Sequence, residues 1–180
     1  MTEQQIVEAI HKGSRKAMRA LYDSLAGYAM ATALRYMPHQ EEAKDILQES
    51  FLKVFSHFNQ FKYQGEGSLR AWVQRIVSNE AINQIQKQSR IIYTDTIADQ
   101  PEEEAEVNLD PVPPKVLNRM IGTLPPGYRM VFNLHVFEDK SHKEIGQILG
   151  IKENSSASQY LRAKRMLAKQ INEYIKRHEK

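Results

Sequence analysis

A proline-rich acidic stretch in the middle of the chain, residues 91–116, is the feature that most constrains the fold. It contains four prolines and the acidic run 102–106, and its apolar residues show no helical spacing. We interpret it as a linker between two folded domains, residues 1–90 and 117–180. Two interpretations of its acidic side chains stay open: they only keep the linker extended and soluble, or they take an active part in function.

Charge is distributed unevenly along the chain. Residues 1–90 carry 12 Lys and Arg against 9 Asp and Glu, residues 91–116 carry 1 against 7, and residues 117–180 carry 12 against 6. The net charge of +3 therefore hides two basic blocks on either side of an acidic one. The C-terminal basic block favours nucleic acid as a partner.

Composition excludes several classes of protein. Of the 180 residues, 41% are hydrophobic and 26% are charged, which is typical of a folded chain. No apolar run approaches the roughly 18 residues of a membrane helix, and the N-terminus lacks a secretory signal, so we expect a cytoplasmic protein without membrane insertion. The chain has no cysteine, and no two of its histidines lie at a ligand spacing, so we expect no metal and no cofactor. Without a P-loop, an HExxH or a GxSxG motif, we do not expect an enzyme.

Two amphipathic helices are predicted near the N-terminus. Apolar residues recur at helical spacing over residues 17–37, where Pro38 ends the pattern, and again from Glu41 to Phe58. The second helix has a polar face formed by Asp45, Gln48, Glu49 and Lys53. Such a strip suits contact with a partner, although most strips of this kind are simply solvated.

The segment from residue 61 to residue 90 combines a glycine loop with a third helix. Gly65 and Gly67 allow a tight loop, and Ser68 is a candidate cap for a helix whose buried stripe includes Trp72. The opposite face carries amides and basic groups: Arg70, Gln74, Arg75, Asn79, Asn83, Gln86 and Lys87. These groups suit phosphates and base edges, and the loop with Phe61 and Tyr63 could receive an unstacked base. The alternative is that Trp72 is core and the amides are solvated.

A helix-turn-helix is predicted near the C-terminus, after two short helical stretches divided by Pro125 and Pro126. Ser141 and Glu144 form a capping box, Gly150 permits a left-handed turn, and Gly146 is small where two helices cross. The second helix is expected to begin at Asn154 or Ser155 and to face DNA with its first turns. The expected contacts are Lys152, Asn154, Ser155, Ser156, Ser158, Gln159 and Arg162, extended by Lys164 and Arg165. Together these patterns predict an all-α fold of two small helical domains.

Three long segments, in this order, resemble the bacterial RNA polymerase sigma factors of the extracytoplasmic-function (ECF) class of the sigma-70 family. Residues 18–61 are similar to the first helices of the family's sigma-2 domain, and residues 65–85 (GEGSLRAWVQRIVSNEAINQI) to its promoter-melting segment. Residues 123–167 are similar to its sigma-4 domain. The resemblance covers nearly the whole chain and implies a factor that binds core RNA polymerase and directs promoter recognition and DNA melting.

The resemblance also implies roles for particular residues. Contacts to the polymerase β′ clamp helices fall on Asp45, Gln48, Glu49 and Leu52. Recognition of the minus-10 element, with capture of a flipped base, falls on Lys62, Tyr63, Gly65, Ser68, Arg75, Asn79 and Asn83. The helix over residues 154–167 reads the minus-35 element, with Arg165 at its far end, while the rest of that domain sits on the β flap. An anti-sigma factor is a further partner that the sequence neither shows nor excludes.

Some residues depart from the family's pattern. Ser156 stands where many relatives have an apolar residue, Asn154 stands where many have glycine, and the segment 86–90 is only weakly basic. For the linker, the resemblance implies a path through the polymerase cleft. If its acidic side chains act there, neutralising Glu102, Glu103, Glu104 and Glu106 should change abortive initiation, and unchanged abortive ratios would count against this hypothesis.

Two other classes of function remain open at this stage. A stand-alone helix-turn-helix regulator would explain residues 117–180 but would leave the first domain unused. A small helical enzyme or scaffold is disfavoured because no catalytic constellation is present.

Overall fold

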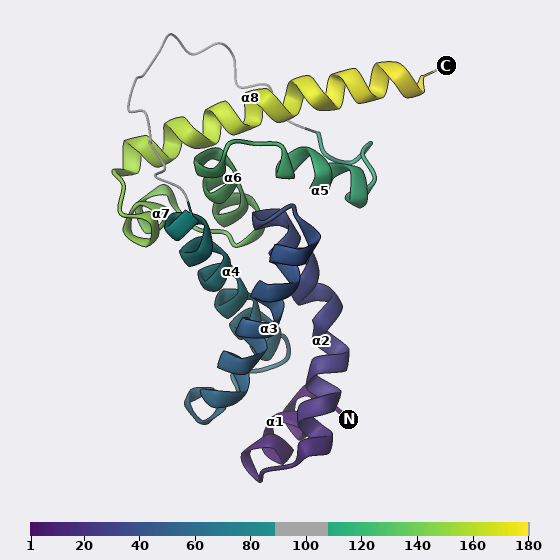
Figure 1. Cartoon of the computed structure of the whole chain (residues 1–180), viewed down its shortest axis with the longest axis vertical. Helices are drawn as coiled ribbons and strands as arrows, with labels where there is room; N and C mark the ends of the chain where they lie inside the picture. Colours follow the sequence, from purple (N-terminus) through teal and green to yellow (C-terminus); the bar gives the residue numbers. More distant parts are fainter. Residues whose placement is uncertain (89–107, 180) are drawn as a thin grey trace. The chain divides into compact units, whose positions relative to one another are not determined.

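The computed structural model describes residues 1–88 and 108–179, and the chain divides into two compact units, Met1–Lys87 and Gln88–Lys180 (Figure 1). In the described residues the regular structure is entirely helical, so the predicted all-α fold is confirmed. None of the described helices is long and apolar enough to span a membrane.

The first unit contains four α-helices and one 3-10 turn. The elements are α1 (Glu3–His11), α2 (Arg15–Tyr36), α3 (Gln40–Ser56), the 3-10 turn Phe58–Gln60 and α4 (Ser68–Gln88). The two predicted helices of this half correspond to α2 and α3, and α2 ends just before Pro38 as expected. Helix α1 was not predicted, although Thr2 and Gln5 form a complete capping box at its start.

Helices α2 and α3 pack against each other through small and branched residues. Ala29 and Ala33 of α2 and Ile46 and Val54 of α3 are buried. A separate aromatic cluster is formed by Phe58, Phe61 and Trp72, with ring centroids 5.0–5.9 Å apart. This cluster fixes the start of the connection between α3 and α4, because Phe58 and Phe61 belong to that connection and Trp72 to α4.

The second unit contains four α-helices around a separate core. The elements are α5 (Pro114–Gly122), α6 (Pro126–Phe132), a π-helical turn (Asn133–Phe137), α7 (His142–Leu149) and α8 (Glu153–His178). Helices α5, α6 and α7 each pack against the long helix α8 (Figure 1). The core residues are Val112, Met120, Ile121, Leu124, Phe132, Ala163, Leu167 and Ile171.

The boundary of the second unit differs from the prediction. Val112 is buried in this core, Leu109 packs against it, and α5 begins at Pro114, where proline suits the first helical position. The second unit therefore includes residues before 117, because Val112 belongs to its core and Leu109 packs against it, although the proline-rich sequence pattern placed them in the linker. The remaining linker residues, 91–107, lie outside the described residues, as does the hypothesis about their acidic side chains.

The predicted turn between α7 and α8 is present. The Ser141 hydroxyl accepts a hydrogen bond from the Glu144 backbone N–H and caps α7, and Gly150 ends the helix with a φ of 70°. Gly146 is required for a different reason from the predicted helix crossing: a Cβ there would lie 2.6 Å from the backbone oxygen of Ile151. Helix α8 begins earlier than predicted, with Lys152 at the N-cap position, so neither Asn154 nor Ser155 is its cap.

Candidate polymerase and nucleic-acid surfaces

The four residues assigned to polymerase contact form one exposed strip on α3. Asp45, Gln48, Glu49 and Leu52, called the docking strip below, all point away from the buried face of the helix. Leu52 is 65% exposed, which is unusual for a large apolar side chain in this structure. Beside the strip lies a hollow lined by Asp45, Ile46, Gln48, Glu49, Glu80 and Gln84. Its carboxylates make the hollow acidic, and Glu80 and Gln84 extend it onto α4.

A pocket of about 380 Å³ opens where the 61–67 loop meets α4, and its volume is in the usual range for ligand pockets. We call it the Arg75 pocket. It is lined by Gln60, Phe61, Lys62, Gln64, Ser68, Ala71, Trp72 and Arg75. Trp72 is half-buried, and Phe61, which the sequence suggested for base stacking, is buried against it. Trp72 is therefore the aromatic side chain with surface left for a ligand.

A second pocket lies on the other side of Trp72. We call it the Asn79 pocket, and it is lined by Lys53, His57, Gln60, Trp72, Ile76, Asn79, Glu80 and Asn83. Asn79 and Asn83 are exposed, one helical turn apart. Since Gln60 and Trp72 line both pockets, the two form adjacent subsites with an aromatic residue between them.

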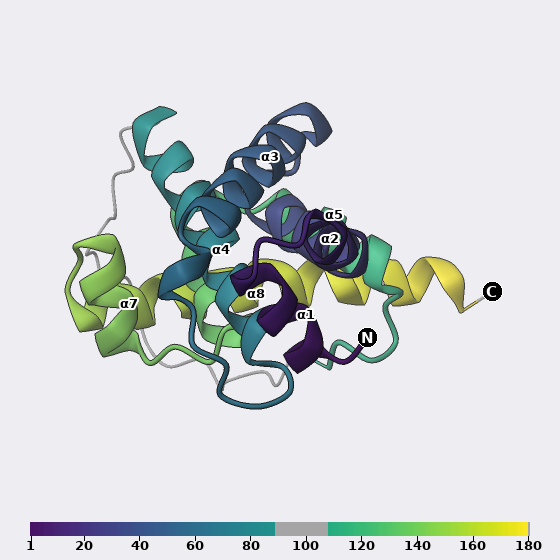
Figure 2. The ribbon, with the colours of Figure 1, turned by 90° about the horizontal axis from the view of Figure 1, so that it is seen from below.

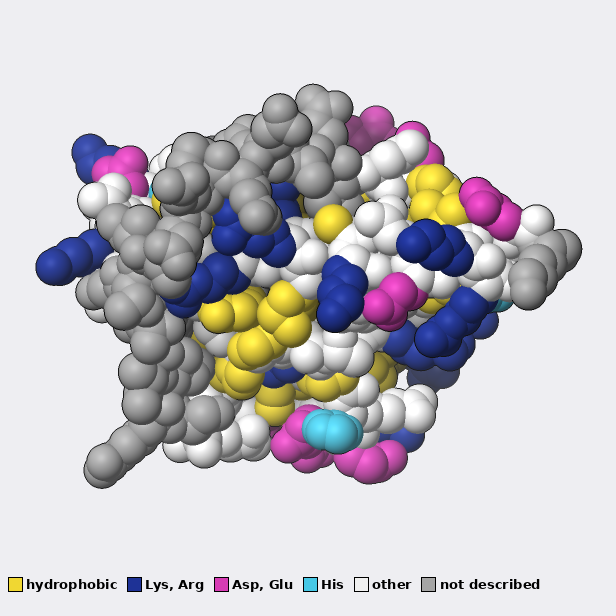
Figure 3. Space-filling model, turned by 90° about the horizontal axis from the view of Figure 1, so that it is seen from above, with side chains coloured by type: hydrophobic (Ala, Val, Ile, Leu, Met, Phe, Trp, Pro, Cys, Tyr) yellow, Lys and Arg dark blue, Asp and Glu magenta, His cyan; other side chains and the backbone are white. Residues whose placement is uncertain are grey.

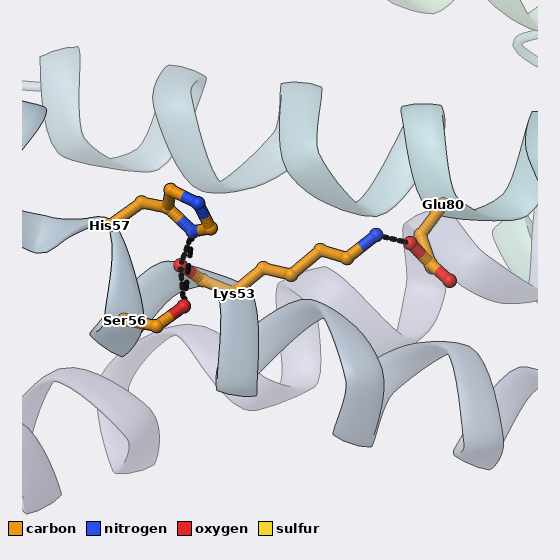
Figure 4. A network of polar contacts seen from close by, with 4 residues as sticks. All are labelled: Lys53, Ser56, His57 and Glu80. Atoms are coloured by element: carbon orange, nitrogen blue, oxygen red, sulfur yellow. Dashed lines mark hydrogen bonds and ion pairs between the residues drawn. The ribbon is translucent and has the colours of Figure 1, made fainter.

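An ion pair joins α3 to α4 at the edge of the Asn79 pocket (Figure 4). The Lys53 ammonium pairs with the Glu80 carboxylate, and the Lys53 carbonyl lies 3.0 Å from the His57 Nδ1. Glu80 also lines the hollow beside the docking strip. One carboxylate thus borders both the hollow and the Asn79 pocket, and Lys53 neutralises it.

Ser68 does not cap α4 as the sequence suggested. The Glu3 carboxylate of α1 accepts hydrogen bonds from the backbone N–H groups of Gly67 and Leu69, both at 2.9 Å. The Ser68 hydroxyl instead ties the loop together, since it accepts from the Gln64 N–H at 3.2 Å and donates to the Gly65 carbonyl at 2.6 Å. The cap comes from a residue 64 positions away, which local sequence patterns cannot reveal.

The exposed side of the helix-turn-helix carries part of the predicted DNA-contacting set. Lys152, Asn154 and Arg165 are exposed, and Ser158 and Arg162 are half-buried. Figure 3, which looks onto the side of the molecule where α8 lies, shows Lys and Arg side chains distributed along it.

Three residues of that predicted set do not face outward. Ser155, Ser156 and Gln159 are buried, so the prediction that they contact DNA is corrected. All three belong to α8, which starts at Glu153, and they lie on the face of the helix that is buried. The Ser156 Oγ lies 2.8 Å from the His142 Nδ1 of α7, so this buried hydroxyl has a polar contact.

Two histidines, His135 of the π-helical turn and His142 of α7, lie close together in the second unit. The rings of His135 and His142 stack with centroids 4.5 Å apart, and both contact the ring of Tyr160. Burial and the neighbouring His135 lower the pKa of His142, while Glu153 opposes the shift. The neutral form of His142 is therefore favoured in the folded protein.

Comparisons with known proteins match both units. Residues 21–91 match sigma-70 region 2, and residues 115–167 match sigma-70 region 4. The ECF RNA polymerase sigma-E factor of Salmonella typhimurium LT2 is 25% identical over 190 aligned positions, which cover 98% of each chain. The sigma-E factor of Haemophilus influenzae is 24% identical, covering 95% of this chain and 96% of its own. A solved structure of the sigma factor RpoE with the anti-sigma factor NepR, from Bartonella quintana, has a TM-score of 0.52 at 18% identity and covers 87% of this chain and 98% of its own.

This chain is an ECF sigma factor of the sigma-70 family. It therefore functions with RNA polymerase in promoter recognition and transcription initiation. A stand-alone helix-turn-helix regulator is excluded, because the sigma-70 region 2 match accounts for the first unit as well.

The structure of this sigma factor brings together most of the residues proposed for the minus-10 element. Lys62, Ser68 and Arg75 line the Arg75 pocket, and Asn79 and Asn83 line the Asn79 pocket. Tyr63 and Gly65 line neither pocket, although Gly65 adopts the positive φ of 109° that the loop needs.

Some pocket residues of the sigma factor were missed from the sequence. Gln60, Gln64 and Trp72 line the pockets but were not among the predicted site residues. Trp72 lies on the same helical stripe as buried apolar residues, so periodicity assigned it to the core. Only the polar residues around it, at positions 60, 75 and 79, could have signalled its second role.

Proposed function

We propose that this sigma factor divides initiation among three surfaces. The docking strip on α3 binds the β′ clamp helices of core RNA polymerase, the two pockets around Trp72 bind the unpaired minus-10 strand, and the exposed start of α8 reads the minus-35 element. The rest of the second unit sits on the β flap. The observation that carries the proposal is the pair of adjacent pockets that share Trp72 and Gln60 and are lined by amides and a guanidinium.

The chemistry of these pockets suits an unpaired DNA strand. A half-buried indole offers a surface for stacking, worth about 1–3 kcal/mol for each base. The amides of Asn79 and Asn83 can donate to and accept from base edges, while Arg75 and Lys62 are suited to phosphates. A base that leaves the duplex exchanges its stacking partner for Trp72, so DNA melting is driven by binding rather than by hydrolysis. We accordingly propose that the factor acts without turnover of its own.

The helix-turn-helix contributes readout of duplex DNA. Lys152 and Asn154 lie at the start of α8, the part of a recognition helix that reaches base edges in the major groove. Ser158, Arg162 and Arg165 follow along the helix and are suited to further base and phosphate contacts. Asn154 and Ser158, one turn apart, are the proposed base-reading pair.

The docking strip combines features of a protein interface. Its carboxylates attract a basic partner surface, and Leu52 supplies apolar area at the end of the strip. Since the polymerase is the partner, we place the protein in the cytoplasm. The solved RpoE structure contains an anti-sigma factor, and we propose that a similar inhibitor covers the docking strip here.

Binding to sigma-free core polymerase tests the docking strip. The double variant Asp45→Ala, Glu49→Ala should weaken binding at least tenfold, with a matched double variant, Glu8→Ala, Asp23→Ala, as the control on exposed acids elsewhere in the first unit. Equal binding by both double variants would remove the docking proposal.

A second experiment tests the pockets in the assembled holoenzyme. Asn79→Ala and Asn83→Ala change exposed side chains, so the fold should be retained while open-complex formation falls about tenfold, corresponding to one or two lost base contacts. Polymerase binding should not change. Open-complex formation at the wild-type level in both variants would contradict base recognition by the Asn79 pocket.

A further inference from the structure

Glu3 is the one side chain of α1 whose carboxylate reaches the wall of the Arg75 pocket through hydrogen bonds in the described structure. It lies in the first turn of α1, outside residues 21–91 that match sigma-70 region 2. Its two carboxylate oxygens accept from different N–H groups: Oε2 from Gly67 and Oε1 from Leu69, each at 2.9 Å. Figure 2 shows α1 beside the loop that precedes α4.

These bonds satisfy groups that a helix leaves unpaired. The first N–H groups of any α-helix have no partner within the helix, and they carry the positive end of its dipole. A carboxylate at this position makes charge-assisted hydrogen bonds, which are about twice as strong as neutral ones. Glu3 thus serves as the cap of α4 from a separate helix, and it fixes the backbone of residues 67–69.

Part of this segment belongs to one wall of the Arg75 pocket, because Ser68, between the two N–H groups that Glu3 binds, lines it. Gln64 and Ser68 both line the pocket, and the Ser68 hydroxyl accepts from the Gln64 N–H and donates to the Gly65 carbonyl. Gly65 and Gly67 have φ values of 109° and 88°, so the loop is built from residues that are conformationally permissive. Without the two backbone bonds from Glu3, the side-chain hydrogen bonds that hold this wall in the described structure would be those of the Ser68 hydroxyl.

Helix α1 is itself held at both ends. Thr2 and Gln5 close the capping box at its start, and at its end the His11 Nε2 lies 3.3 Å from the Phe58 carbonyl oxygen, with the two rings 5.3 Å apart. Phe58 also packs against Trp72, the aromatic side chain shared by the two pockets. Helix α1 therefore bridges the loop wall and the aromatic wall of the Arg75 pocket.

We propose that Glu3 is a positioning residue for base capture, which holds the 64–69 loop so that the Arg75 pocket has its binding shape before DNA arrives. The inference rests on the proposed role of that pocket. A preformed pocket favours a strand that carries an intact base over one that lacks it. A pocket with a mobile wall would bind both strands with similar affinity.

The decisive measurement uses holoenzyme assembled from core polymerase and the full chain. Single-stranded non-template oligonucleotides are taken from a promoter selected in vitro by this holoenzyme, and an abasic site is placed at each minus-10 position in turn. The readout is the ratio of affinities for the intact and abasic strands at the most sensitive position. Glu3→Ala should lower this ratio about tenfold while affinity for core polymerase stays within twofold of wild type. Glu3→Gln, which keeps one acceptor oxygen, should fall between the two.

Matched variants separate positioning from general destabilisation. Glu8→Gln changes an exposed acid on the same helix and should leave the ratio unchanged. Ser68→Ala loosens the same wall but leaves the two backbone bonds of Glu3 in place, and it should lower the ratio as Glu3→Ala does. Hydrogen exchange at the Gly67 and Leu69 amides should accelerate in Glu3→Ala, because these are the N–H groups that Glu3 binds.

Two results would overturn the inference. The first also contradicts base capture by the pocket, and the second contradicts only the positioning role of Glu3. If wild-type holoenzyme does not distinguish intact from abasic strands at any position, base capture itself is wrong and the inference fails with it. If the wild type does distinguish them and Glu3→Ala does so equally, despite faster exchange at Gly67 and Leu69, base capture stands and Glu3 is only a structural cap.

Discussion

Gln159 is a polar residue whose surroundings decide its role. It lies in the second turn of α8 and is 2% exposed, and its Nε2 has no hydrogen-bond partner among the described residues. An amide group that is buried without a partner costs about 1–3 kcal/mol relative to water. The side chain therefore weakens the second unit rather than reading DNA.

Replacing Gln159 by the apolar residue of similar length, Gln159→Met, should stabilise the second unit by about 1 kcal/mol. Tryptophan fluorescence does not report on the second unit, because the single tryptophan, Trp72, lies in the first unit. Stability is therefore better measured by native-state hydrogen exchange of α8 amides, which should slow about fivefold. Affinity for minus-35 DNA should stay within twofold, whereas the exposed-residue comparison Asn154→Ala should reduce it. If Gln159→Met no longer distinguished minus-35 DNA from unrelated DNA, Gln159 would be a DNA-contacting residue, in contradiction to this prediction.

His142 makes the second unit sensitive to pH. Its ring stacks on His135 and contacts Tyr160, its Nδ1 lies near the Ser156 hydroxyl, and Glu153 is the nearby acid that favours its charged form. Burial and then His135 hold the pKa of His142 below its ordinary value of 6.5. Because the unfolded chain takes up this proton more readily than the folded chain, protonation favours unfolding.

The free energy of unfolding of the second unit should consequently be highest above pH 6.5 and fall as the pH drops from 6.5 through the lowered pKa of His142. The variant His142→Gln removes the titrating group and should flatten this dependence between pH 6.5 and pH 5.5. Hydrogen exchange of α7 and α8 amides over this range gives the measurement. Parallel pH profiles for wild type and variant would show that His142 does not carry the effect.

Helix α7 and the turn after it depend on one glycine. A Cβ on Gly146 would lie 2.6 Å from the Ile151 backbone oxygen, and the Ile151 N–H donates to the Gly146 carbonyl at 3.0 Å. The contact is with backbone, so a larger side chain cannot be accommodated by rotating a neighbour. The turn would have to open, and the angle between α7 and α8 would change.

Gly146→Ala should therefore destabilise the second unit by about 1–3 kcal/mol and weaken minus-35 binding by holoenzyme. Ala is otherwise the better helix former, so a substitution without the close contact would stabilise α7. Circular dichroism together with hydrogen exchange in α7 reports the loss, and Gln147→Ala at an exposed neighbouring position is the control. A stabilised Gly146→Ala variant would show that the turn tolerates the Cβ.

Element by element, the sequence predicted what depends on neighbouring residues. Apolar periodicity located α2, α3 and α4, and the Ser141 cap and Gly150 turn were predicted correctly because each depends on residues within one or two helical turns. The Glu3 cap was missed because its partners are 64 and 66 residues away. Ser155, Ser156 and Gln159 were wrongly predicted to face DNA. Consecutive helical residues point about 100° apart, so Asn154, Ser155 and Ser156 cannot all lie on one face, and the sequence did not show which face is buried.

At the scale of the whole molecule, the distribution of charge sets how the factor responds to salt. Residues 117–180 carry an excess of six positive charges, and the exposed Lys152 and Arg165 lie at the start of α8 and three turns along it. Each phosphate that a protein neutralises releases condensed counterions, which makes affinity fall linearly with salt on a double logarithmic plot. The slope of this plot is proportional to the number of phosphate contacts. The change in slope caused by a single substitution therefore shows whether that side chain contacts a phosphate.

Lys152→Gln and Arg165→Gln should each lower the slope for binding of holoenzyme to duplex minus-35 DNA by about 1, because each removes one phosphate contact. Core polymerase contributes to the absolute slope, but its contribution cancels in the difference from wild type. Lys176→Gln is the matched control, since Lys176 is an exposed basic residue of the same helix, 24 residues from Lys152 and about 36 Å along the axis. An unchanged slope in the first two variants, or an equal change in the control, would show that the start of α8 is not the part of the helix that lies against the phosphates.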